Sequence, residues 1–451
     1  MKRIPALWVG LVLLAALLPA CSLQTGLEPR QPITLNLWHN FGGQMQAAMD
    51  GLLQDFNSTL GMEKGIIVNV TSVASSASLQ AKLAMIAAGD PGAPQMPDIA
   101  TCYPATAALL SAKGLLTPLD DHLTDQELAA YLPEFVEEGR LSDGQLYVFP
   151  FAKSTEVLIL NRTLFEPFAA AVGVDIESLS TFEGVAEVAQ RYFQWSGGKE
   201  FLAVDSIFNL FQLGMEQLGE NLIDEGKLNT ESPAFRRIWN TTLEPTLRGG
   251  CAIYPGYSSD LAKTGDVVCS LGSTAGILFY GDEIILPDNT RVPVEYSVLP
   301  YPVFSEGKSI AIQRGGGLVV ARSTPAKEAA AATFLKWFTS PEQNMRFVAD
   351  TGYLPVTHSA FAHHLEREAR ENRNPNIRRL LETAMHMHEE YSFFTPTPFD
   401  GLNALAERFK TNFLILAEQG RAEYVLSSAD RVTAYERASA GLLEEFVASL
   451  R

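Results

Sequence analysis

Aromatic and amide side chains follow directly on the first predicted strand, in the run Trp38-His39-Asn40-Phe41. Parallel strands present ligand-binding groups beyond their carboxyl ends. An aromatic ring can stack on the apolar face of a sugar while polar groups reach its hydroxyls. Trp38 and His39 are therefore candidate ligand contacts, and Tyr103 follows the third predicted strand in the same way. For Trp38 a place in the core is an equally good interpretation, and for His39 it is the better one.

A glycine run at 315–317 lets a ligand approach the backbone with no side chain in between, so Gly316 is a further candidate contact. No G-x-x-x-x-G-K-[ST] motif surrounds it, which argues against a nucleotide site. The pairs His363-His364 and His386-x-His388 have metal-like spacing. They lie in charged helical stretches with neither a cysteine cluster nor an H-E-x-x-H motif, so we expect surface histidines and neither metal nor cofactor.

The first 21 residues carry the features of a secretory signal. Lys2 and Arg3 precede an apolar run over 4–20, and Cys21 follows small residues. This pattern resembles a bacterial lipobox, which implies lipidation of Cys21, a polar tether over 22–31, and a location outside the cytoplasm at the cell membrane. An uncleaved anchor is the alternative, although the run is shorter than the ~20 residues of a bilayer span.

Composition describes an ordinary globular chain. It has 451 residues, of which 47% are hydrophobic, and this length suggests two or three domains. The formal net charge of −18 argues against nucleic acid, whose phosphates require a basic face. Beyond Cys21, we expect Cys102 to be a buried thiol. Cys251 and Cys269 flank a glycine- and tyrosine-containing loop, and the sequence leaves open whether they form a disulfide.

Strand and helix patterns alternate through the first part of the chain, which predicts an α/β fold with a largely parallel sheet. The predicted strands are 33–38, 66–73 and 99–103, and the predicted helices are 44–56, 78–88 and 105–112. Apolar strands follow at 157–162 and 317–321, and a tail over 404–451 is predicted to be helical throughout. Because there is no repeat or long linker, the two α/β halves must be joined by segments that run back and forth.

Several segments resemble the extracellular solute-binding proteins of carbohydrate ABC importers, most closely the glycerol-3-phosphate-binding branch. The resemblance lies in 37–43, in the run from Asp143 to Arg162, in 315–318, and above all in FLKWF at 334–338, SPE at 340–342 and TGYLP at 351–355. It implies a two-lobed, hinge-linked, periplasmic-binding-protein-like fold of type II that closes an interlobe cleft on ligand. Lobe 1 would comprise 32–150 and 301–350, and lobe 2 would comprise 151–300 and 351–451.

The resemblance also implies ligand contacts. Tyr353 would face the cleft, and Ser154 would lie where the chain crosses between lobes. Ser273 would start a helix, either as a contact or as an ordinary N-cap. Asp205 and Phe208 occupy a stretch where the branch has tryptophans, and we favour Asp205 as the N-cap of the following helix.

Two departures from the branch bear on specificity. Pro104 stands where an acidic residue follows the tyrosine, and Asp400 stands near the position of a phosphate-contacting arginine. Asp400 would repel phosphate and prefer hydroxyls, so we expect a sugar rather than glycerol 3-phosphate.

The resemblance therefore implies a monomeric lipoprotein, not an enzyme, that captures a carbohydrate or related polyol and delivers it to an ABC permease. Three alternatives stay open. They are a glycerol-3-phosphate or glycerophosphodiester-binding protein of the same fold, a lipoprotein scaffold or receptor with a degenerate cleft, and a secreted glycoside hydrolase. The hydrolase would need two positioned carboxylates, and no motif singles out a pair.

Overall fold

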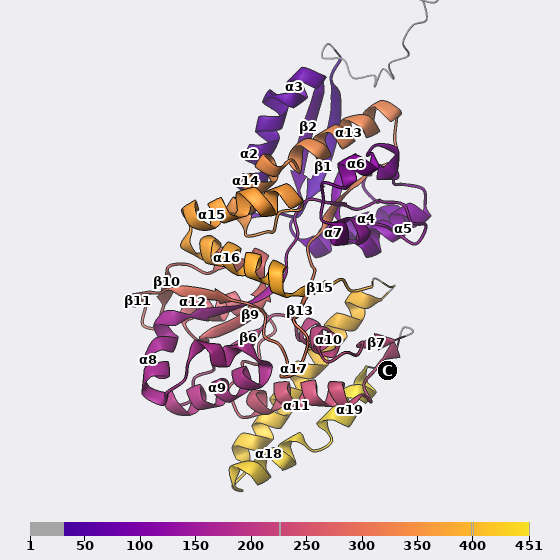
Figure 1. Ribbon diagram of the computed structural model, residues 1–451. Coiled ribbons are helices and arrows are strands. Elements are labelled where there is room, and N and C mark those ends of the chain that lie inside the picture. Colours follow the sequence, from indigo (N-terminus) through magenta and orange to yellow (C-terminus); the bar gives the residue numbers. More distant parts are fainter. Residues whose placement is uncertain (1–30, 225–226, 398, 400, 451) are drawn as a thin grey trace, which may run out of the picture.

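The computed structural model describes residues 31–224, 227–397, 399 and 401–450, and these form two lobes stacked end to end (Figure 1). Each lobe is built around its own β-sheet, as the sequence predicts. The sheet of lobe 1 has the strand order β2-β1-β3-β14-β4. Its strands are β2 (Ile66–Ser72), β1 (Ile33–His39), β3 (Ile99–Cys102), β14 (Gly317–Val320) and β4 (Phe149–Pro150). Strands β1, β2 and β3 are mutually parallel, and β14 is antiparallel to both of its neighbours.

Helices cover both faces of the lobe 1 sheet. On one face lie α2 (Gly43–Ser58), α13 (Pro325–Phe338) and α14 (Pro341–Thr351), and on the other lie α4 (Ser76–Ala88) and α5 (Pro104–Ala112). Helix α2 buries Met49, Leu52, Leu53 and Phe56, which recur at helical spacing. All four residues of β3 are buried, as expected for a strand covered on both faces.

Lobe 2 contains a four-stranded sheet of order β12-β5-β9-β6. Its strands are β12 (Tyr296–Leu299), β5 (Glu156–Asn161), β9 (Cys269–Ser273) and β6 (Leu202–Val204). Around it pack α8 (Arg162–Val172), α9 (Phe182–Trp195), α10 (Ile207–Gln217), α11 (Pro233–Leu247), α12 (Ser258–Thr264) and α16 (Pro375–Glu390). The whole of β5 is buried, although its first residue is a glutamate.

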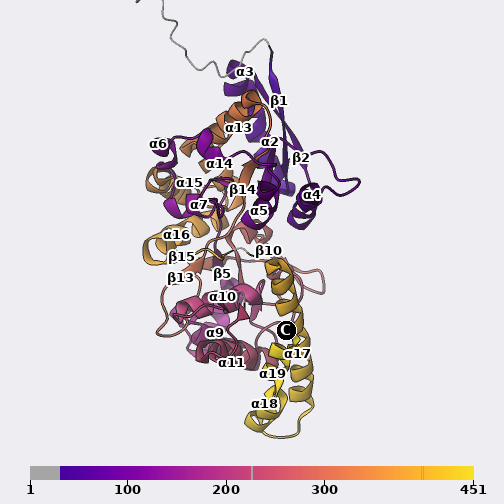
Figure 2. The ribbon, with the colours of Figure 1, turned by 90° about the vertical axis from the view of Figure 1, so that its right-hand side faces the viewer.

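The tail is helical, as the sequence predicts, and it is divided into three helices. They are α17 (Leu402–Leu426), α18 (Arg431–Ser439) and α19 (Leu442–Ser449), and α17 runs along the length of lobe 2 (Figure 2). Asp430 caps α18 through two backbone N–H groups, and Gly441 takes a left-handed conformation with φ of 76° before α19. Asp430 thus marks the start of α18 as its N-cap. Gly441 separates α18 from α19, because a left-handed residue cannot continue a right-handed helix.

Three chain segments lie side by side where the lobes meet. The backbone of Ser154 pairs with Arg314, and that of Lys153 pairs with Leu354. A Cβ at Gly315, which has a φ of 100°, would collide with the Ala152 carbonyl oxygen, so this approach requires glycine. Tyr301, Phe304 and Ile312 pack in the core of lobe 2. We therefore propose the predicted lobe boundary at 150, with the middle crossing moved from 301 to about 313 and the last moved from 350 to beyond Val356, which packs in the core of lobe 1.

The three described cysteines, Cys102, Cys251 and Cys269, are buried free thiols. Leu202 pairs with Cys269 on one side and with Cys251 on the other, so strand β6 separates these two cysteines. Neighbouring strands lie about 4.8 Å apart, which puts the two Cα atoms beyond the reach of a disulfide. The disulfide that the sequence left open is therefore not formed. No helix within the described ranges is long and apolar enough to span a bilayer.

Candidate functional site

The carboxyl ends of the parallel strands of lobe 1 meet at the edge that faces lobe 2. Tyr103 directly follows β3 there, and its side chain is 40% exposed. The Ser76 hydroxyl donates to the Tyr103 Oη at 3.2 Å. A Cβ added to Gly316 would lie 3.8 Å from the Tyr103 ring, so these two predicted contacts are neighbours. Lobe 1 thus presents an accessible aromatic face beside bare backbone.

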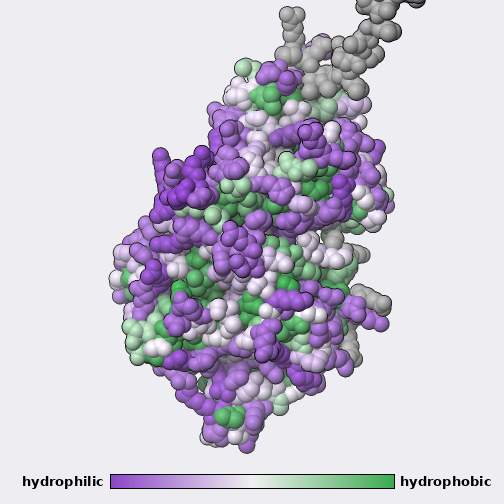
Figure 3. Space-filling view, viewed as in Figure 1, coloured by the Kyte–Doolittle hydropathy of each residue, from purple (hydrophilic) through white to green (hydrophobic). Residues whose placement is uncertain are grey.

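The facing edge of lobe 2 carries polar residues at three strand ends. Strand β5 begins at Glu156, which is paired with Ser273 at the end of β9, and β6 leads into Asp205. Ser273 is also the N-cap of the following turn and accepts a bond from the Ala275 N–H. In outline, the molecule is indented on one side between the two lobes (Figure 3).

Glu156 and Arg314 form an ion pair that the sequence analysis missed. The Arg314 Nη1 donates to the Glu156 Oε1 at 2.8 Å, and the Asn209 amide donates to the same oxygen at 2.5 Å. Glu156 is 3% exposed, whereas Arg314 keeps 42% of its side chain in contact with solvent. Burial raises the pKa of the Glu156 carboxyl above its ordinary value, and Arg314 and Asn209 act against that rise.

Asp205 does not cap the helix that follows it, which corrects the favoured sequence prediction. Ser206 is the N-cap of α10, and Asp205 instead accepts the Ser258 N–H at 2.7 Å. Burial raises the pKa of the Asp205 carboxyl, and the Ser258 bond opposes this. The Lys410 ammonium donates to the backbone oxygens of Asp205 and Pro255. Two carboxylates and two cations therefore converge at this edge.

A second exposed aromatic residue lies beside this cluster. Tyr257 immediately precedes Ser258 and is 71% exposed. A tyrosine this accessible has no role in the core, and its ring is free to stack on an apolar ligand face. The sequence signal was its place next to Gly256 in a loop, which does not distinguish a ligand contact from an ordinary surface residue.

The remaining predicted contacts are more buried. Tyr353 is half-buried against Phe347 and Phe41, and burial raises the pKa of its phenol. The charges of Tyr103 and Arg314 also act on the pKa of the Tyr353 phenol, which places Tyr353 near these two residues. Ser154 is 5% exposed, and its backbone pairs with Arg314. Trp38 is half-buried and packs on the core beside α4 and α5.

Two predicted contacts lie in hydrophobic cores. His39 is fully buried, and its Nδ1 accepts the Phe41 N–H at 3.1 Å. Burial lowers the pKa of the His39 imidazole. Phe208 is 4% exposed and packs edge-on against Phe409. The structure therefore does not bring these two side chains to the interlobe edge. Asp400 and Cys21 lie outside the described residues.

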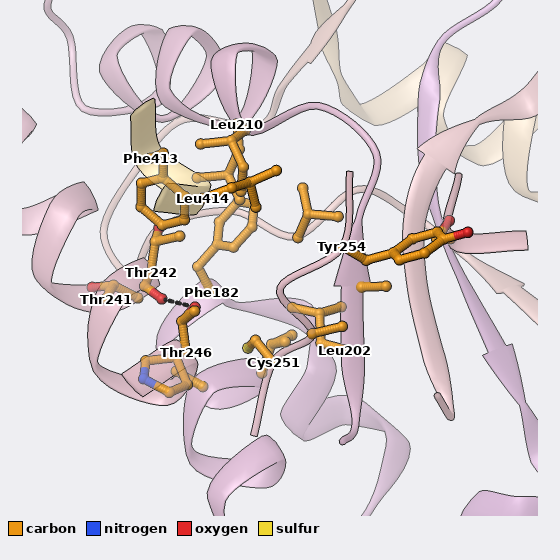
Figure 4. A pocket seen from close by; sticks show the side chains of 18 of the residues that line it. Phe182, Leu202, Leu210, Thr241, Thr242, Thr246, Cys251, Tyr254, Phe413 and Leu414 are labelled. Carbon is orange, nitrogen blue, oxygen red and sulfur yellow. Dashed lines mark hydrogen bonds between the residues drawn. The ribbon is translucent and has the colours of Figure 1, made fainter. Parts of the chain in front are cut away.

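A small cavity lies inside lobe 2 between α11, α17 and β6 (Figure 4). Leu202, Leu210 and Phe413 make its wall largely apolar. Its volume of about 40 Å³ gives room for a few water molecules. Sites for small ligands have volumes of about 300 Å³ or more, so this cavity is not the ligand site. Over the described residues, no three histidine, cysteine or acidic side chains gather as a metal site.

Comparison with known proteins gives a consistent result. Residues 51–372 match the family model described as bacterial extracellular solute-binding protein. The chain is 26% identical over 252 residues to the maltotriose-binding protein of Pyrococcus abyssi. This alignment covers 54% of this chain and 51%, about half, of the relative. It is 22% identical over 351 residues to the sn-glycerol-3-phosphate-binding periplasmic protein of Rhizobium meliloti, covering 72% of this chain and 76% of the relative.

Solved structures give the same fold. The crystal structure of the cyclic alpha-maltosyl-1,6-maltose binding protein from Arthrobacter globiformis superposes with a TM-score of 0.65 at 20% identity. The match covers 92% of this chain and all of that one. The predicted two-lobed α/β fold is thereby confirmed.

Proposed function

The chain belongs to the bacterial extracellular solute-binding protein family, and we propose that it captures a carbohydrate or related polyol between its lobes for delivery to the permease of an ABC importer. The observation that carries this proposal is an exposed tyrosine in each lobe: Tyr103 follows β3, and Tyr257 precedes Ser258, which bonds to Asp205. Carboxylates and cations near Asp205 and Arg314 supply both acceptors and donors. Stacking surfaces beside such groups suit a molecule rich in hydroxyls.

Capture would follow from closure about the three crossing segments. The Ser154–Arg314 pairing and the Thr155 hydroxyl bond to the Ile312 carbonyl hold two of these segments together. A hinge of a few such residues can turn while both lobes keep their own cores. No bond of the ligand needs to change, and the relatives found are binding proteins. We propose that the protein is held at the outer face of the membrane through Cys21.

The experiment is thermal unfolding of the chain from Ser22 in the presence of maltose, maltotriose, ribitol or glycerol 3-phosphate. A ligand at a hundredfold its dissociation constant stabilises the folded state by about 2.7 kcal/mol, which raises the melting temperature by a few degrees. We expect such a rise with a neutral sugar or polyol and its loss in Tyr103→Ala.

The matched control is Trp195→Ala. Trp195 is also an exposed aromatic residue, at 44%, but it lies on α9 against Phe168. This variant should melt earlier because it loses packing, yet it should keep the full ligand response. Absence of any response across the panel, or an undiminished response in Tyr103→Ala, would contradict the proposal.

A glycerol-3-phosphate ligand is the second candidate, and the likeness to the Rhizobium meliloti protein favours it. The same panel separates the two. A rise with glycerol 3-phosphate alone would select the anionic ligand over the neutral one.

A further inference from the structure

Arg314 is a cation placed at the interlobe site with most of its donors unused. A guanidinium group has five N–H donors. Within the described residues, the Arg314 side chain makes one hydrogen bond, to Glu156. The side chain is 42% exposed and lies in the neighbourhood of Tyr103 and Tyr353. An arginine presented in this way, without a partner, would be a strong site for phosphate or carboxylate.

Glu156 opposes that tendency with a fixed negative charge. Its Oε1 accepts from both Arg314 and Asn209, and the residue is 3% exposed. Its backbone pairs with Ser273 of β9. Asn209 is held in turn, because its backbone N–H bonds to the Ser206 cap at the start of α10. The carboxylate therefore cannot turn away from Arg314 without losing two hydrogen bonds.

Asp205 adds a second negative charge at the same edge. Its bonded partner is the neutral Ser258 N–H, and among the described residues the Lys410 ammonium donates to two backbone oxygens. Arg314 and Lys410 thus face two carboxylates. A bound anion would meet both attraction and repulsion, whereas hydroxyl groups, which donate and accept, can use the acids and the bases together.

We propose that Glu156 determines the charge of the accepted ligand, by cancelling the charge of Arg314 so that uncharged polyhydroxyl compounds are bound and phosphorylated ones are rejected. This inference rests on the proposed function. Glu156 acts through Arg314 and is therefore a positioning residue. The residue that would contact the ligand is Arg314.

The test is Glu156→Gln, which keeps the shape and an acceptor for Arg314 but removes the negative charge. The probes are glycerol 3-phosphate and its uncharged counterpart glycerol, measured by calorimetric titration at low ionic strength. We expect Glu156→Gln to bind glycerol 3-phosphate more tightly than the wild type by on the order of tenfold, as expected when one charge is uncovered near a bound phosphate. This gain should weaken with added salt, and glycerol should show no gain.

Two controls isolate the local effect. Glu137→Gln changes the net charge equally, but Glu137 is 71% exposed and pairs with Arg140 away from the site. It should leave the affinity for glycerol 3-phosphate unchanged. The double variant Glu156→Gln/Arg314→Gln should lose the gain, because the uncovered cation is gone.

One result would overturn the inference: a folded Glu156→Gln that binds glycerol 3-phosphate no more tightly than the wild type. If Glu156→Gln does not fold, Asp205→Asn should give a smaller gain in the same direction, and no gain there would reject the idea. A sugar response in the wild type without an anion gain in the variant would reject this inference and keep the proposed function. An anion gain without any sugar response would keep this inference about Glu156 and reject the proposed function.

Discussion

Two ion pairs where the lobes meet, Lys153–Glu138 and Arg314–Glu156, differ in their access to water. The Gln313 amide donates to Glu138, which also accepts from Lys153 at 2.7 Å, and the side chains of Lys153 and Glu138 are 3% and 10% exposed. The next residue, Arg314, bonds to Glu156 at 2.8 Å and remains 42% exposed. The first acid belongs to lobe 1 and the second to lobe 2. The bonds to Glu138 thus hold the segment against lobe 1, whereas Arg314, bonded to Glu156 of lobe 2, stays accessible to a ligand.

Burial decides which of these roles an ion pair can have. A sealed pair has no other partner, so removal of one member leaves an uncompensated charge in the interior. A pair that is open on one side can exchange part of its bonding for water or for ligand. The Lys153–Glu138 pair is therefore expected to set stability, and the Arg314–Glu156 pair to set binding.

Breaking the buried Lys153–Glu138 pair should lower the free energy of unfolding more than breaking the Arg314–Glu156 pair. Glu138→Gln leaves the Lys153 ammonium buried without its counter-charge, and we expect a loss of about 3 kcal/mol in the free energy of unfolding, measured by urea titration. The neighbouring Glu137→Gln, at a 71% exposed position, should cost less than about 1 kcal/mol. Equal losses in the two variants would remove the distinction between the sealed and the exposed acid.

The open pair should show a smaller loss of stability and a larger loss of binding. Arg314→Gln leaves Glu156 with its Asn209 bond, and the raised pKa of its carboxyl lets it bind a proton in place of a counter-charge, so we expect a loss of about 1 kcal/mol in the free energy of unfolding. The rise in melting temperature caused by the bound sugar should disappear. Arg162→Gln, which breaks the exposed pair with Glu166, is the control and should keep the rise. A full ligand response in Arg314→Gln would contradict the binding role.

The pH dependence sharpens the same comparison. Burial raises the pKa of Glu156 in the folded state, so the folded protein binds this proton more readily than the unfolded chain. This stabilisation is present at low pH and is lost as the pH rises through the raised value. Relative to Glu156→Gln, the wild type should therefore lose stability as the pH rises from the ordinary value of 4.5 through the raised pKa of Glu156.

Arg314, Asp205 and Tyr301 are the charged or titratable groups that act on Glu156. The difference between the two proteins therefore reports the titration of Glu156 as it is coupled to Asp205. Urea unfolding of both proteins at several pH values measures this difference. A difference that does not vary with pH would mean that Glu156 titrates as an ordinary carboxyl.

The sequence predicted the elements whose signals are local. The alternating strands, the helices and the aromatic residue after β3 follow from spacing, and the predicted contacts Tyr103 and Gly316 lie next to each other. The Arg314–Glu156 pair was not found, because its members are 158 positions apart. A signal was present, since Glu156 opens an otherwise apolar strand beside the crossing, and a charged residue there requires a partner.

The sequence could not decide which of two adjacent residues caps a helix, nor which strands lie next to each other in a sheet. Asp205 and Ser206 are both good N-cap types, and their neighbours do not decide between them. Cys251 and Cys269 flank one loop, but β6 is inserted between them by long-range pairing that leaves no local trace. Phe208 lies in an apolar helix, and it faces the core because it packs against Phe409 of α17, 201 positions along the chain.

The decisive measurement is the distance between the lobes with and without sugar. The three described cysteines are buried, and burial raises the pKa of the Cys251 thiol to about 12, so fluorophores should react with introduced cysteines instead. Lys113→Cys on lobe 1 and Lys227→Cys on lobe 2 replace exposed residues. We predict that energy transfer between the two dyes increases with each sugar that raises the melting temperature. A sugar that raises the melting temperature while the distance stays constant would contradict capture by closure of the lobes.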